Sequence, residues 1–93
     1  MATGGSAEKA ARQSVRRALR NKAVESATKT FIRKAEKLVQ DKELVEAERA
    51  VLQAIRALDR AVRKGVIHPN NSARRKSRLM AKFNSAKMQA STN

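Results

Sequence analysis

Two rows of basic residues have the spacing that a chemical function would need. Each row consists of three side chains separated by four residues, and in an α-helix this spacing stacks them along one face about 6 Å apart. The rows are Arg12, Arg16 and Arg20 near the start of the chain and Arg74, Arg78 and Lys82 near its end. Lys9 and Arg17 flank the first row, and Arg75 and Lys76 flank the second.

Rows of like charge point to an anionic partner. Like charges four residues apart destabilise an isolated helix, so such rows make sense if a phosphate backbone lies along them. Arginine also binds phosphate with two parallel hydrogen bonds. A solvated helix face is the alternative, but two such rows and the absence of any acid after Gly65 argue against it. We therefore predict phosphate binding.

The net charge supports the same conclusion. The chain has 93 residues, a formal net charge of +14 and a pI near 11.6. Residues 1–40 carry +7, residues 41–64 carry +1 and residues 65–93 carry +6. A folded monomer with this excess repels itself, and nucleic acid is the usual partner that offsets the repulsion. The two ends are predicted to face the ligand, and the near-neutral middle to be scaffold.

Catalytic and metal-binding groups are scarce. The chain has no cysteine and a single histidine, His68, which therefore has no partner for a metal site or a nucleophile–base pair. The acids between Asp41 and Glu48 are ordinary partners of a helix dipole. We expect no enzyme, no metal ion, no cofactor and no small-molecule substrate.

Aromatic residues narrow the class of nucleic acid. The sequence has two phenylalanines, no Trp and no Tyr. Both Phe31 and Phe83 have core spacing, so no platform for stacking single-stranded bases is predicted. The remaining candidate partners are folded RNA and DNA, which proteins recognise through phosphates and shape. A nucleoid-type DNA-binding protein is therefore one alternative. A membrane-surface amphipathic helix fits less well, because the first helix lacks a large apolar face and no run could span a membrane.

The first predicted helix runs from about residue 6 to residue 39. Ser6 is its expected N-cap, and no Gly or Pro interrupts it. Its larger apolar residues recur at three or four positions, and they are Val15, Leu19, Phe31, Ala35 and Leu38. Since only two of these lie in the first half, we expect that half to project from the body.

Two further helices follow. The second, with Asp41 as N-cap, is predicted to run to Lys64, and Gly65 should take a left-handed cap with Val66 and Ile67 folding back. Pro69 begins the third helix, capped by His68 or Asn70. The apolar faces consist of Leu44, Val51, Ile55, Leu58 and Val62 in the second helix and Leu79, Phe83 and Ala86 in the third.

The predicted fold is all-α, an up-down-up three-helix bundle with a long, partly projecting N-terminal helix. Residues 6–90 are predicted to form a single three-helix-bundle domain that binds nucleic acid, between a flexible start at residues 1–5 and a flexible end at residues 91–93. Asp59 is expected to pair with Arg63 on one helix face.

Several segments resemble one known family. They are Ser6-Ala7, Lys9, Arg12-Gln13, Arg16-Arg17, Arg20-Asn21, residues 29–34 (KTFIRK), Leu58-Asp59-Arg60-Ala61, residues 64–68 (KGVIH), Asn70 and residues 73–79 (ARRKSRL). Together they are similar to the bacterial small-subunit ribosomal protein S-twenty family over about residues 6–88. The block around residues 58–79 is the specific part.

The resemblance implies a three-helix bundle that binds small-subunit (16S-type) ribosomal RNA directly and stabilises its folding during assembly. It implies contacts with the 5′ domain and the long penultimate helix of that RNA, beside other small-subunit components, in a bacterial cytosol or a plastid ribosome. It adds Asn21, His68, Asn70 and Ser77 to the RNA-binding residues. Thr3-Gly4-Gly5 and Pro69 depart from the family pattern, so fewer contacts are expected there.

Overall fold

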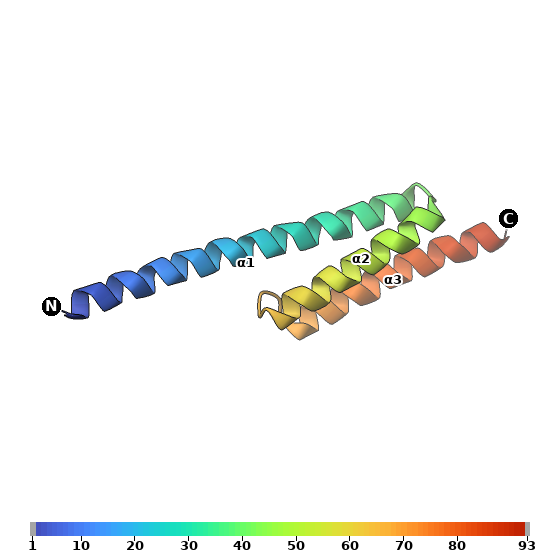
Figure 1. Ribbon diagram of the computed structural model, residues 1–93. Helices are drawn as coiled ribbons and strands as arrows, with labels where there is room; N and C mark the ends of the chain where they lie inside the picture. The colour runs from blue at the N-terminus through green and yellow to red at the C-terminus, as the bar shows by residue number, and fades with distance from the viewer. Residues whose placement is uncertain (1, 93) are drawn as a thin grey trace.

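The fold consists of three helices in one continuous arrangement. The computed structural model describes the backbone of residues 2–92 and the side chains of residues 7–90. The helices are α1 (Ala2–Gln40), α2 (Leu44–Arg63) and α3 (Pro69–Thr92), and they run up, down and up (Figure 1). No strand occurs among residues 2–92. The predicted all-α, up-down-up bundle is confirmed.

The start of α1 differs from the prediction. The helix already begins at Ala2, so Ser6 lies within it and is not its N-cap. Two glycines at positions 4 and 5 do not prevent this, because glycine within a helix costs only about 1 kcal/mol. The ends predicted to be flexible, residues 1–5 and 91–93, lie outside the residues whose side chains are described.

A tight cap joins α1 to α2. Lys42 has a φ of 62°, its N–H donates to the Val39 carbonyl at 3.1 Å, and the Glu43 N–H donates to the Leu38 carbonyl at 3.0 Å. These two bonds form a Schellman motif, with a lysine in the left-handed position that glycine usually takes. Asp41 therefore belongs to the end of α1, and the predicted N-cap there is wrong. Glu43 is the N-cap of α2, and its side chain makes no capping bond.

The same motif ends α2, here with glycine. Gly65 has a φ of 74°, its N–H donates to the Val62 carbonyl at 2.9 Å, and the Val66 N–H donates to the Ala61 carbonyl at 2.9 Å. Ile67 is buried beside Ala61, so the predicted return of the chain onto the core is confirmed.

His68 begins α3. Its Nδ1 accepts a hydrogen bond from the Asn70 N–H at 3.1 Å, and its carbonyl accepts one from the Ser72 N–H at 3.1 Å. Of the two predicted caps, the structure therefore has His68, with Pro69 at the first helical position.

The core lies along the inner faces of the helices. The larger cluster consists of Ala35, Val39, Ala47, Ala50, Val51, Ala54, Leu79 and Phe83, and the smaller one of Leu58, Ala61 and Ile67. Ile32 packs against both clusters, whereas Phe31 is 37% exposed. The prediction that Phe31 is a core residue is wrong, since two adjacent residues in a helix point about 100° apart.

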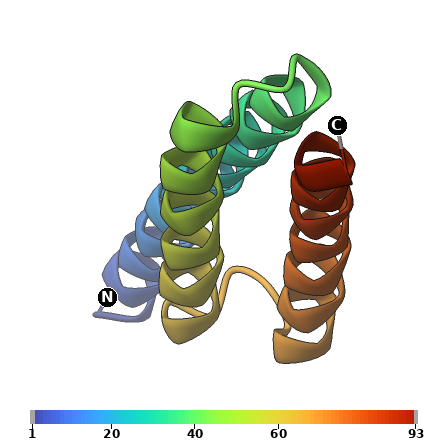
Figure 2. The ribbon, with the colours of Figure 1, turned by 90° about the vertical axis from the view of Figure 1, so that its right-hand side faces the viewer.

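Half of α1 lies outside the bundle. Every described side chain from residue 7 to residue 20 is exposed, including Val15 at 59% and Leu19 at 63%. The 39-residue helix is about 58 Å long, and the molecule measures 74 × 21 × 13 Å. Seen from the end, α2 and α3 stand side by side while α1 recedes behind them (Figure 2). The predicted projection of the first half of α1 is confirmed.

Candidate nucleic-acid interface

The first basic row lies on the projecting half of α1. Arg12, Arg16 and Arg20 are all exposed, as is Lys9. Arg12 makes a weak, solvated ion pair with Glu8 at 3.7 Å, so most of the row's charge is available to a partner. Further along α1, Val24, Thr28 and Ile32 are partly or fully buried against the other helices. The helix is therefore basic where it projects and largely apolar on the face that packs.

Arg17 and Asn21 lie on a different line of α1. They are spaced by four residues, and two further steps along the helix lead to the buried Thr28. Arg17 is exposed and Asn21 is partly buried, where α1 leaves the bundle. These two side chains therefore lie on the same face of α1 as the residues that pack against the bundle.

The second basic row lies along α3. Arg74, Arg78 and Lys82 are exposed, whereas Arg75 and Lys76 are partly buried against the bundle. The structure does not bring the two rows together, because α3 lies beside the bundled half of α1 and the first row lies on its projecting half (Figure 1). The bundle instead separates them along its long axis.

Arg75 and Lys76 of α3 each have a partner within the protein. Arg75 Nε donates to Asn71 Oδ1 at 3.2 Å, which orients the guanidinium. The ammonium group of Lys76 pairs with the Asp59 carboxylate of α2. The predicted Asp59–Arg63 pair within α2 is therefore not formed, because Asp59 turns toward α3. Lys76 is thus partly neutralised and connects two helices.

Three polar residues implied by the family resemblance lie at the start of α3 or along its first half. His68 and Asn70 are exposed, but the capping bond described above occupies His68 Nδ1. Ser77 is exposed on the outer side of α3. Each of them can reach a partner beyond the bundle.

A basic groove between α1 and α3 was not predicted from the sequence. Its volume is about 280 Å³, and it is lined by Lys29, Ile32, Arg33, Glu36, Arg75, Arg78 and Lys82. Lys29 and Arg33 were missed because they belong to no evident row. Their four-residue spacing was a signal, but only the rotation of α1 against α3 places them opposite the second row.

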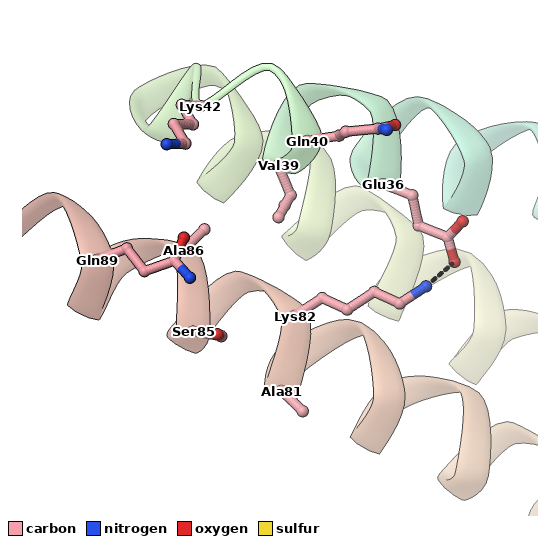
Figure 3. A pocket seen from close by; sticks show the side chains of 9 residues that line it. All are labelled: Glu36, Val39, Gln40, Lys42, Ala81, Lys82, Ser85, Ala86 and Gln89. Atoms are coloured by element: carbon pink, nitrogen blue, oxygen red, sulfur yellow. Dashed lines mark ion pairs between the residues drawn. The ribbon is translucent and has the colours of Figure 1, made fainter.

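A wider cleft continues from this groove toward the ends of α1 and α3 (Figure 3). Its volume is about 660 Å³, and its lining is mostly small or uncharged, including Val39, Ser85 and Ala86. Glu36 and Lys82 line both hollows and pair across them at 3.4 Å. This ion pair stands where the basic groove meets the cleft.

The middle segment, residues 41–64, has a nearly neutral net charge, but its first part is acidic and its second part is basic. Residues 41–48 contain four acids and one lysine, whereas residues 49–64 contain five basic residues and one acid. The basic end of α2 lies at the turn to α3, on the side from which α1 projects (Figure 1). The positive charge of the whole molecule therefore increases toward that end.

Groups for other chemistry are not assembled in the described residues. No three His, Asp or Glu side chains in this part of the chain lie close enough to hold a metal ion. Phe83 is buried, and the Lys87 ammonium lies 5.7 Å from its ring centroid, so this ring offers no stacking surface, whereas the Phe31 ring is 37% exposed. None of the described helices has both the length and the apolar character that crossing a membrane requires.

Comparisons with known proteins agree with this geometry. The family model described as "Ribosomal protein S20" matches residues 2–84. The small ribosomal subunit protein bS20 of Thermomicrobium roseum is 54% identical over 79 residues, which cover 85% of this chain and 80% of that protein. The bS20 protein of Carboxydothermus hydrogenoformans is 54% identical over 70 residues, covering 75% of each chain. That of Clostridium perfringens is 46% identical over 84 residues, covering 90% of this chain and 97% of that protein.

Proposed function

Because this chain belongs to the ribosomal protein S20 family, whose members are structural proteins of the small ribosomal subunit, we propose that its two basic rows are the surfaces that bind ribosomal RNA. The chain belongs to a family of structural proteins, and rRNA binding is the general role of that family. Its role is to hold folded RNA together while the subunit assembles. Its place is the ribosome, in the cytoplasm of a bacterium.

The exposed charge of the projecting half carries this proposal. Five cations and one acid lie between residues 8 and 20, and every side chain there is exposed. None of these cations is needed by the core, and their mutual repulsion weakens the free helix. A surface of this kind becomes favourable when phosphates lie along it and release their counterions.

The bundle contributes rigidity to this binding. The packing of α2 and α3 on the second half of α1 fixes where the second row lies relative to the first. Two segments of RNA that both touch the protein are then held at a set distance. From the family resemblance, we propose that they belong to the 5′ domain and to the long penultimate helix of the small-subunit RNA.

The proposal predicts how binding depends on salt. Purified protein is titrated with the 5′ domain of small-subunit ribosomal RNA at several salt concentrations, with random duplex DNA as competitor. Tight binding that survives the competitor, with affinity falling steeply as salt rises, is the expected result. Equal loss to duplex DNA would favour the nucleoid-type alternative, and binding without salt dependence would contradict the proposal.

A double variant tests the first row directly. Replacing Arg16 and Arg20 with glutamine keeps helix propensity but removes two charges that have no acid partner among the described residues. The slope of log affinity against log salt should fall by about two phosphate contacts. The matched control is K34Q/K37Q, which removes two exposed charges from the same helix. An equal effect of both variants would show that only net charge matters, and would refute a defined row.

A further inference from the structure

We propose that the groove between α1 and α3 is an RNA contact in which α1 adds to the second row, that it takes backbone phosphates, and that Glu36 holds its affinity down. The inference rests on the proposed RNA-binding function and adds a site to it. It concerns two residues of α1, Lys29 and Arg33, that no row includes. These residues face the second row across the groove.

The charge of the lining is the first argument. Lys29, Arg33, Arg75, Arg78 and Lys82 contribute five positive charges to the groove, and Glu36 contributes one negative charge. The two other hollows bounded by α3 are each lined by only two basic residues and one acid. Lys29 and Lys82 have weak, solvated acid partners, Glu25 at 3.6 Å and Glu36 at 3.4 Å, so the three guanidinium groups carry most of the uncompensated charge and repel each other unless an anion lies between them. The α1–α3 groove is thus the one of the three that suits a phosphate.

The geometry of the groove is the second argument. Since α1 and α3 run in the same direction (Figure 1), the cations that line the groove from each helix form two facing lines. The line on α3, from Arg75 to Lys82, extends for about 10 Å. The groove has a volume of about 280 Å³, less than half that of the neighbouring cleft. That space admits a phosphate group and excludes a folded helix, so the occupant is a segment of RNA backbone that passes over the seam.

The state of the individual cations is the third argument. Among the described residues, neither Arg33 nor Arg78 is paired with an acid, so both guanidinium groups are available for bidentate phosphate contacts. Arg75 is partly buried and oriented by Asn71, which reduces the entropy that binding must remove. The groove therefore offers three guanidinium groups in one place.

Glu36 opposes this binding. Its carboxylate lies in the groove and pairs with the Lys82 ammonium at 3.4 Å, as Figure 3 shows. An incoming phosphate is repelled by Glu36 and competes with it for Lys82. Both partners are about half exposed, so the pair is weak enough to be exchanged. Glu36 thereby keeps the free groove from binding anions indiscriminately.

The test compares two pairs of variants of the full chain on small-subunit ribosomal RNA. K29Q/R33Q should lower the slope of log affinity against log salt by about two contacts, whereas K34Q/K37Q, with the same charge loss on the same helix, should change it much less. Circular dichroism and thermal melting show that both variants fold. An equal change in the two variants, or none in K29Q/R33Q, would overturn the groove site.

A second comparison tests Glu36. E36Q should tighten RNA binding by about threefold, because it removes the only acid of the groove and releases Lys82. The control is E48Q, which makes the same charge change at an exposed acid of α2 outside the groove. Equal tightening by both would overturn the role of Glu36. If R16Q/R20Q weakens binding while the groove variants do not, the groove inference fails and the proposed function stands.

Discussion

Replacing Leu58 with alanine should lower the free energy of unfolding by about 3–4 kcal/mol. Leu58 is completely buried in the smaller core cluster, beside Ala61 and Ile67. The substitution removes three carbon atoms, worth about 2.4 kcal/mol at ~0.8 kcal/mol each. The cavity left between the helices adds the remainder, since the small side chains around it have little to fill the space with.

The effect is large for this bundle because its total stability is small. A domain of this length is stable by about 5–14 kcal/mol at ~0.05–0.15 kcal/mol per residue. Leu58 also lies next to the turn that begins α3, so its loss should loosen that end. Urea denaturation followed by far-ultraviolet circular dichroism measures the change, at fixed protein and salt concentration.

Leu52 supplies the control for this measurement. It lies on the same helix and is 48% exposed, so L52A should cost less than about 1 kcal/mol. If L58A and L52A destabilise the protein equally, the assignment of Leu58 to a tightly packed core is wrong. The cations are untouched in L58A. Below its melting temperature this variant should therefore keep the salt dependence of RNA binding.

Two further predictions concern the helix ends. G65A should lower the free energy of unfolding by about 1–2 kcal/mol in thermal or urea denaturation, because residue 65 has a φ of 74°. A Cβ there would meet no atom within 4 Å, so the substitution adds only backbone strain. K42G should raise stability by about 1 kcal/mol in the same assay, because Lys42 occupies the equivalent left-handed position with a φ of 62°; a loss of stability would show that the lysine side chain matters more than its backbone. H68A should cost about 0.5–2 kcal/mol by removing the acceptor of the Asn70 N–H, and H68N should restore most of it, because asparagine is a preferred N-cap. Equal destabilisation by H68A and H68N would mean that His68 does not act through its cap.

The features that local chemistry decides could be predicted from the sequence. Gly65 followed by two apolar residues and Pro69 identified both the end of α2 and the start of α3. The absence of a breaker before residue 40 identified one long helix, and the scarcity of large apolar residues before residue 20 identified its projection. Each of these conclusions depends on the residues of one segment and not on its contacts with another helix.

The features that depend on how helices face one another could not be predicted. The sequence alone does not say whether Phe31 or its neighbour Ile32 points inward, and the packing of α2 and α3 decides for Ile32. Asp59 has a suitable partner within its own helix, yet Lys76 of α3 is the one it pairs with. The Schellman motif at Lys42 could not be predicted either, because the left-handed position there holds neither glycine nor asparagine.

The candidate interface divides in the same way. The two rows are visible in the sequence because a spacing of four always places side chains on one face. That they lie at different points along the molecule follows only from the tertiary structure. So does the meeting of Lys29 and Arg33 with α3, which requires the relative rotation of two helices.

The unbroken length of α1 fixes the distance between the first basic row and the groove. From Arg16, in the middle of the first row, to Arg33 in the groove, the helix rises by about 25 Å, and no glycine, proline or turn within that span can change this distance. Once one end is bound, the other is held near its target at a high effective concentration, but only if the RNA places that target at the right distance. Two RNA segments at another separation gain only one of the two contacts. The helix therefore favours the correctly folded RNA over its partly folded forms without reading a single base.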